Sequence, residues 1–171
     1  MSEPFTLYKL IVLYMLDKVD FPLTNAQISE FILDRDYTTY FTLQSVLSEL
    51  TESGMIRQET IRNCSYFTIT DSGSEALHYF QNRISKSIRE EIDQYMYDNK
   101  IKLRDEVSII ADYYRNTADE YSVRCVGKEK YANPIDLTIT VPDESQAKNV
   151  CRNWKEHCQE IYEFVMRELL S

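Results

Sequence analysis

The sequence predicts an α+β protein of two modules joined by a long helix. In the first module, residues 45–59 read SVLSELTESGMIRQE, a helix that ends in Ser-Gly and runs straight into an extended segment. The chain then turns at Arg62 and Asn63 and returns as YFTIT, which predicts a hairpin. Beyond residue 100, three extended segments precede one amphipathic helix, a pattern that predicts a sheet with one covered face.

Three helices are predicted ahead of the hairpin. Residues 5–17 are apolar on nearly every side, as in a mostly buried helix. Thr24 and Gln27 have the spacing of a capping box, which begins a second helix that ends near residues 34–36. The third helix is expected over residues 38–53, because apolar residues recur there at spacings of three and four: Leu43, Val46, Leu47 and Leu50.

The hairpin follows the third helix directly. Gly54 stands where a helix requires a left-handed residue after its end. Residues 55–70 then supply two strands, and Asp71 or Ser72 is expected to cap the next helix. The order of helix, strand, turn and strand is typical of a winged helix-turn-helix, and we assign that domain to residues 1–72.

A single helix is predicted over residues 73–98, within a connecting segment of residues 73–100. Its apolar residues form a narrow stripe: Leu77, Phe80, Ile84, Ile88, Ile92 and Tyr95. A helix of about 25 residues is about 38 Å long. Because that length exceeds what a 70-residue domain covers, the stripe is expected to pack against a second copy of the chain or against the rest of this chain.

Residues 101–171 are predicted to form a three-stranded antiparallel sheet covered by one helix. The strands are expected at 107–115, 121–128 and 135–141, and the last alternates apolar and polar residues. The helix opens after Pro142, and its inner face is predicted to consist of Ala147, Val150, Cys151, Trp154, Cys158, Ile161, Val165 and Leu169.

Composition excludes several classes of function. The longest apolar run falls short of the 18 residues or so that a membrane span requires. The four cysteines form no CxxC pair, so without a signal peptide we expect reduced thiols and a cytoplasmic protein. There is no Gly-rich phosphate loop, and neither His78 nor His157 belongs to a nucleophile pattern. We therefore expect neither an enzyme nor a cofactor or metal site.

Residues 1–98 resemble the winged helix-turn-helix transcriptional regulators of the PadR and MarR type. The resemblance is carried by LSELTESGMI and YFTITDSGSEAL, in which Leu47, Leu50, Gly54, Ile56 and Gly73 match the motif. The whole chain also resembles an uncharacterised bacterial family known only as a domain of unknown function. The first resemblance implies a transcriptional regulator that binds double-stranded DNA as a homodimer.

The leucine spacing indicates which side of the third helix faces outward. With the apolar residues pointing inward, the helix presents a polar face to the major groove, and the wing at residues 55–70 reaches the DNA backbone or minor groove. Phe41 also points outward and is expected to need cover from another part of the protein. The predicted DNA-binding residues are Thr38, Thr39, Thr42, Gln44, Ser45, Ser48, Arg57, Arg62 and Asn63.

Charge supports an alternative function. The chain has a net charge of −9, and residues 1–71 contain five basic and ten acidic side chains. Residues 38–53 contain no Lys or Arg. Because phosphate neutralisation supplies most affinity for DNA, the alternative is a winged-helix adaptor that binds protein and not DNA.

The second module leaves a further choice open. Tyr113, Tyr114, Tyr121 and Arg124 are candidates to line a pocket for a small effector, and the alternative is ordinary sheet packing. The module is expected to dimerise, to sense an effector or to contact a protein partner.

Overall fold

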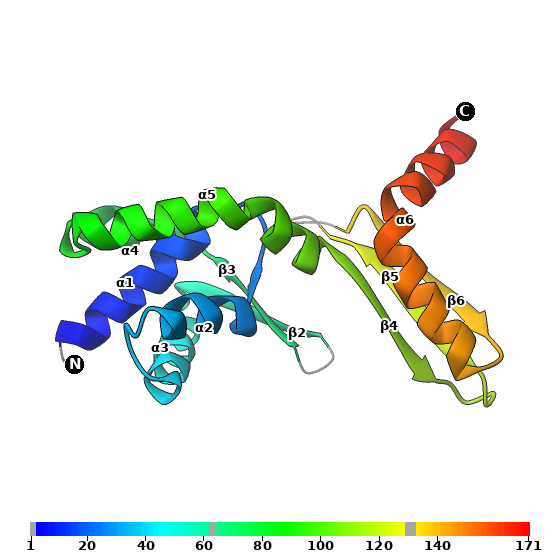
Figure 1. Cartoon of the computed structure of the whole chain (residues 1–171), viewed down its shortest axis with the longest axis horizontal. Coiled ribbons are helices and arrows are strands. Elements are labelled where there is room, and N and C mark those ends of the chain that lie inside the picture. The colour runs from blue at the N-terminus through cyan, green and yellow to red at the C-terminus, as the bar shows by residue number, and fades with distance from the viewer. Residues whose placement is uncertain (1–2, 62–63, 129–132) are drawn as a thin grey trace. The chain divides into compact units, whose positions relative to one another are not determined.

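The computed structural model describes residues 3–61, 64–128 and 133–171. Over these residues the protein is a mixed α+β structure with six α-helices and two three-stranded antiparallel sheets (Figure 1). The chain divides into two compact units, Met1–Arg104 and Asp105–Ser171, here called unit 1 and unit 2. Each unit contains one of the sheets.

Unit 1 combines helices with a small sheet. The helices are α1 (Glu3–Asp17), α2 (Asn25–Asp34), α3 (Tyr40–Glu52), α4 (Asp71–Phe80), a short 3₁₀ helix (Gln81–Arg83) and α5 (Lys86–Ser108), which continues into unit 2. The strands are β1 (Leu23–Thr24), β2 (Ile56–Ile61) and β3 (Cys64–Ile69), in the order β1-β3-β2. Strand β1 was not predicted. Its two residues show no period, and only their pairing with Phe67 and Tyr66 of β3 makes them a strand.

The predicted helix starts and stops in this unit are largely confirmed. The Thr24 hydroxyl accepts a hydrogen bond from the Gln27 amide at 3.1 Å, and the Gln27 side chain accepts one from the Thr24 amide at 3.0 Å. Gly54 has φ of +75°, as the end of α3 requires. The predicted cap at Asp71 or Ser72 is wrong by one residue. Thr70 caps α4, because its hydroxyl accepts from the amide of Gly73.

The prediction of one helix over 73–98 is wrong. Helix α4 ends at Phe80, the chain turns at 81–83, and Ile84 is extended before α5 begins at Lys86. Ser85 starts the new helix, since its hydroxyl accepts from the amide of Ile88 at 3.3 Å. The break contains no Gly or Pro, and apolar residues keep their helical spacing across it. The spacing alone therefore predicted one continuous helix.

The apolar stripe packs within the chain. Ile84 and Ile92 are fully buried, and Met96 is also in the core. The Tyr14 hydroxyl on α1 donates to the Asp93 carboxylate on α5 at 2.8 Å, so α1 is one of the partners of α5. The rest of the chain covers Leu77, Ile84 and Ile92 of the predicted stripe, whereas Phe80 is 42% exposed.

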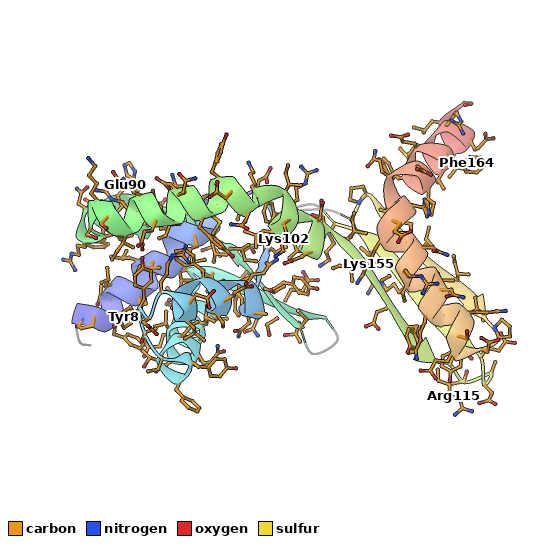
Figure 2. All side chains as sticks on the ribbon, viewed as in Figure 1. Tyr8, Glu90, Lys102, Arg115, Lys155 and Phe164 are labelled. Carbon is orange, nitrogen blue, oxygen red and sulfur yellow. The ribbon has the colours of Figure 1, made fainter. Side chains whose placement is uncertain are left out.

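Unit 2 is a sheet with one helix across it (Figure 1). Strands β4 (Ile109–Arg115), β5 (Tyr121–Gly127) and β6 (Ile135–Val141) pair in that order, and α6 (Glu144–Leu170) packs on them through Ala147, Trp154 and Cys158. Strand β4 begins two residues later than predicted, because α5 continues to Ser108. The C-terminal part of α6 extends beyond the sheet and carries Phe164 (Figures 1 and 2). The prediction that Leu169 lies on the inner face is wrong, because this residue is 76% exposed there.

Candidate nucleic-acid interface

Helix α3 separates into an apolar and a polar face, as predicted. Leu43, Val46, Leu47 and Leu50 are all buried. The opposite side exposes Phe41, Ser45, Ser48 and Glu52, with Thr42 and Glu49 half-buried beside them. The buried leucine face therefore fixes which short polar side chains α3 offers to solvent.

Two amide side chains connect α3 to α2 by a pair of hydrogen bonds. The Asn25 amide donates to the Gln44 carbonyl at 2.7 Å, and the Gln44 amide donates to the Asn25 carbonyl at 3.0 Å. The Ser29 hydroxyl also donates to the Asn25 carbonyl at 2.9 Å. Gln44 was predicted to contact DNA, but this reciprocal pair gives it a structural partner. Asn25 was not predicted to matter, because nothing in the sequence pairs residues 19 apart.

The remaining hydroxyls lie along the exposed side of α3. The Thr39 hydroxyl caps the helix by accepting from the Thr42 amide at 3.3 Å, and it donates to the Thr42 hydroxyl at 3.0 Å. Thr38 is half-buried and precedes the helix. Ser45 donates to the Phe41 carbonyl at 3.2 Å, and Ser48 is exposed one turn further on. Thr42, Ser45 and Ser48 thus form a row of short polar groups.

Two arginines of the hairpin were predicted to contact DNA, and Arg57 is the one within the described residues. Arg57 is exposed on β2, opposite Thr68 of β3. Arg62 and Asn63 lie outside the described residues. Next to Arg57 along β2, the Gln58 amide donates to the Ser65 hydroxyl of β3 at 3.0 Å.

Acidic charge near α3 is partly neutralised within unit 1. The Lys9 ammonium on α1 lies 2.7 Å from a carboxylate oxygen of Glu49. This lysine was not among the predicted site residues, and 40 residues separate it from its partner. Arg35 is engaged elsewhere, with its guanidinium 4.2 Å from the centre of the Phe31 ring. Helix α3 itself contributes no positive charge.

The four predicted effector residues of unit 2 do not line one pocket. Tyr113 and Tyr121 face α6, and their rings lie 6.0 Å apart. Tyr114 and Arg124 lie on the opposite side of the sheet, because neighbouring strand residues alternate between faces. The Arg124 guanidinium hydrogen bonds to both carboxylate oxygens of Asp136, and this contact lowers the pKa of that carboxyl.

A cavity of about 540 Å³ in unit 1 is lined by Pro4, Thr6, Leu7, Leu10 and Arg83.

Among the residues that the structure describes, no group of three or more His, Cys, Asp or Glu side chains is arranged to hold a metal ion. No helix in the described part of the chain is both long and apolar enough to cross a membrane.

Comparison with known proteins identifies the family of this chain. Searches of curated proteins and of solved structures each returned no match. One family model covers residues 8–169, nearly the whole chain. The protein therefore belongs to the family described as "Domain of unknown function (DUF4364)".

Proposed function

We propose that this protein is a cytoplasmic transcriptional regulator that binds double-stranded DNA as a homodimer. In this proposal, residues 1–72 form a winged helix-turn-helix in which α3 enters the major groove. Strands β2 and β3 are the wing and contact the backbone or the minor groove. Arg57 is the wing arginine within the described residues, and in this proposal it contacts a DNA phosphate.

One observation carries the proposal. The four apolar residues of α3 are buried, and the surface left over is a row of hydroxyls on a helix whose first turns are held in place. Hydroxyl groups suit both phosphate oxygens and base edges. The Asn25–Gln44 pair and the Thr39 cap fix the helix that presents them.

A dimer compensates for the weak positive charge. A single copy offers few cations near α3, so doubling the contacts is the simplest way to reach useful affinity. The stripe on α4 and α5 gives the dimer little support, because Leu77, Ile84 and Ile92 are buried within the chain and only Phe80 is exposed. The support comes from the end of α6, where Phe164 is 55% exposed and Leu169 and Leu170 are each 76% exposed. Apolar surface of this kind favours a protein contact.

Fluorescence anisotropy with random-sequence duplex DNA tests the proposal. We expect binding at about 50 mM salt that weakens as salt rises, because released counterions drive the association. Arg57→Ala should weaken binding and reduce the salt slope by about 1 for each phosphate that the guanidinium neutralises. Lys86→Ala is the matched control, since Lys86 is an exposed cation on α5. No binding at low salt would contradict the proposal.

The second candidate is a protein-binding adaptor. Two observations favour it: the excess of acidic side chains in residues 1–71, and the exposed aromatic pair Tyr40 and Phe41 at the start of α3. Exposed aromatic rings are frequent anchors of protein interfaces. An adaptor would show no affinity for duplex DNA at any salt concentration.

A further inference from the structure

Phe41 stands at the start of α3 with 83% of its surface exposed. We expected another part of the protein to cover it, and no described residue of unit 1 does so. Tyr40 is next to it, 51% exposed, with the two rings edge to face and 5.9 Å apart. Single exposed apolar residues are common and need no explanation. An exposed ring on the surface that we propose for DNA does need one.

The ring projects from a rigidly held part of the helix. Thr39 caps α3 two residues before Phe41, and Ser45 donates a hydrogen bond to the Phe41 carbonyl one turn later. Gln44 ties the same turn to Asn25 of α2. The backbone that carries Phe41 is therefore fixed before any partner binds, which lowers the entropy cost of binding.

The residues of α3 are unsuited to reading guanine. Guanine is most often recognised by an Arg or Lys fork, and residues 38–53 contain neither. Adenine is most often recognised by an Asn or Gln amide, but the Gln44 amide is bonded to Asn25. What remains near the start of the helix is the exposed aromatic pair Tyr40 and Phe41, with the hydroxyls of Thr38, Thr42 and Ser45 nearby, and Phe41 is the more exposed ring.

In the major groove, the apolar group that such a ring can contact is the C5 methyl of thymine. In helix-turn-helix proteins, the N-terminal residues of the recognition helix are the ones that contact base edges. We infer that α3 recognises A·T base pairs, with a thymine methyl packed on the Phe41 ring in each half-site. This inference rests on the proposed function, because it requires α3 to lie in the major groove.

Removing only the methyl group tests the inference. The probes are three 20-base-pair duplexes: alternating dT and dA, the same duplex with deoxyuridine in place of every thymine, and alternating dG and dC. We expect the protein to bind the thymine duplex about fourfold more tightly than the deoxyuridine duplex for each methyl contacted, the value of one buried methyl. Binding to the dG–dC duplex should be weaker still.

Variants separate the ring from other effects of deoxyuridine on the duplex. Phe41→Ala should bind the thymine and deoxyuridine duplexes equally, whereas Phe41→Leu should keep part of the difference. Tyr97→Ala is the matched control, because Tyr97 is 84% exposed on α5 and should leave the discrimination unchanged. Thermal melting of each variant checks that the fold is intact.

The results distinguish two failures. Equal affinity of the unmodified protein for the thymine and deoxyuridine duplexes would overturn the thymine contact while leaving DNA binding in place. Discrimination that persists in Phe41→Ala would do the same. Absence of binding to all three duplexes at low salt would overturn the proposed function and this inference with it.

Discussion

Gln44 illustrates how a residue's role depends on a neighbour that sequence spacing cannot identify. Its position on the flank of α3 made it a plausible DNA contact. The structure gives its amide two hydrogen bonds to Asn25, on the preceding helix. Such a pair satisfies both amides and sets the spacing of α2 and α3, so Gln44 acts on the proposed interface through its geometry.

Gln44→Ala should destabilise unit 1 by about 1 kcal/mol, because it leaves the part-buried Asn25 amide without its partner. Asn25→Ala should have a similar cost. The double variant should cost less than the sum of the two, since the second change removes a group that is already unpaired. Urea denaturation measures all three free energies of unfolding. Strictly additive costs would contradict a direct pairing.

Cys125 makes the stability of unit 2 depend on pH. Burial, and then the nearby thiols of Cys151 and Cys158, raise its pKa from the ordinary 9.0 to about 11. The unfolded chain therefore loses this proton near pH 9, while the folded chain keeps it up to about pH 11. Folding stability should fall as pH rises through that range, by about 2 kcal/mol.

Urea denaturation at about pH 8 and about pH 10.5, on either side of the ordinary thiol pKa, measures this loss. Cys125→Ala should have lower stability at the lower pH and a smaller difference between the two pH values, because the residue that titrates is gone. The comparison removes the contribution of other groups that titrate in the same range. Equal pH dependence in the two proteins would show that the Cys125 thiol is not held in its neutral form by the fold.

At the scale of elements, the sequence predicted what local signals specify. Residues close together in the sequence specify the capping box of α2, the buried face of α3 and the end of α3 at Gly54. The structure contains all three features. The end of α4 and the two-residue strand β1 were missed. Ser85 was the available signal for the first, but the apolar spacing continued across it. Strand β1 depends on a partner more than 40 residues away.

Gly73, near the start of α4, lies against the backbone of Met55, the residue before β2. A Cβ atom at this position would lie 2.0 Å from the backbone carbonyl oxygen of Met55, so one of the two backbones has to move. Gly73→Ala should destabilise unit 1 by about 3 kcal/mol, at the upper end of overpacking costs. Thermal or urea denaturation measures the change.

Gly127→Ala is the comparison for this prediction. There the added Cβ would lie 2.9 Å from a methyl of the Ile135 side chain, which can rotate away more easily than a backbone. Its cost should be clearly smaller than that of Gly73→Ala. If the two glycine variants lose the same stability, the backbone approach at Gly73 is not the cause.

For the whole molecule, the sequence predicted two units and the elements of each, whereas the candidate site was predicted only in part. Ser45, Ser48 and Arg57 are exposed where expected. Gln44 and the four effector residues of unit 2 are arranged differently, because their neighbours come from other elements. Periodicity specifies which face of an element is buried, but not which polar groups meet across elements.

We predict that the protein associates with itself through the end of α6. Leu169 and Leu170 are largely exposed, and replacing Leu169 with Lys should leave the fold intact while disrupting an apolar contact between copies. Light scattering after size-exclusion chromatography should give twice the chain mass for the unmodified protein and a lower mass for Leu169→Lys. Glu163→Gln, a polar change on the same helix, should retain the dimer.

The proposed function requires the hydroxyl face of α3 to contact DNA. NMR spectra of the isotopically labelled protein, recorded as duplex DNA is added at low salt, show whether it does. The proposal predicts that the backbone amides of residues 39–48 shift progressively, together with those near Arg57, while the interior of the β4–β6 sheet changes little. Shifts confined to residues 105–171, or no shift in α3 at saturating DNA, would contradict it.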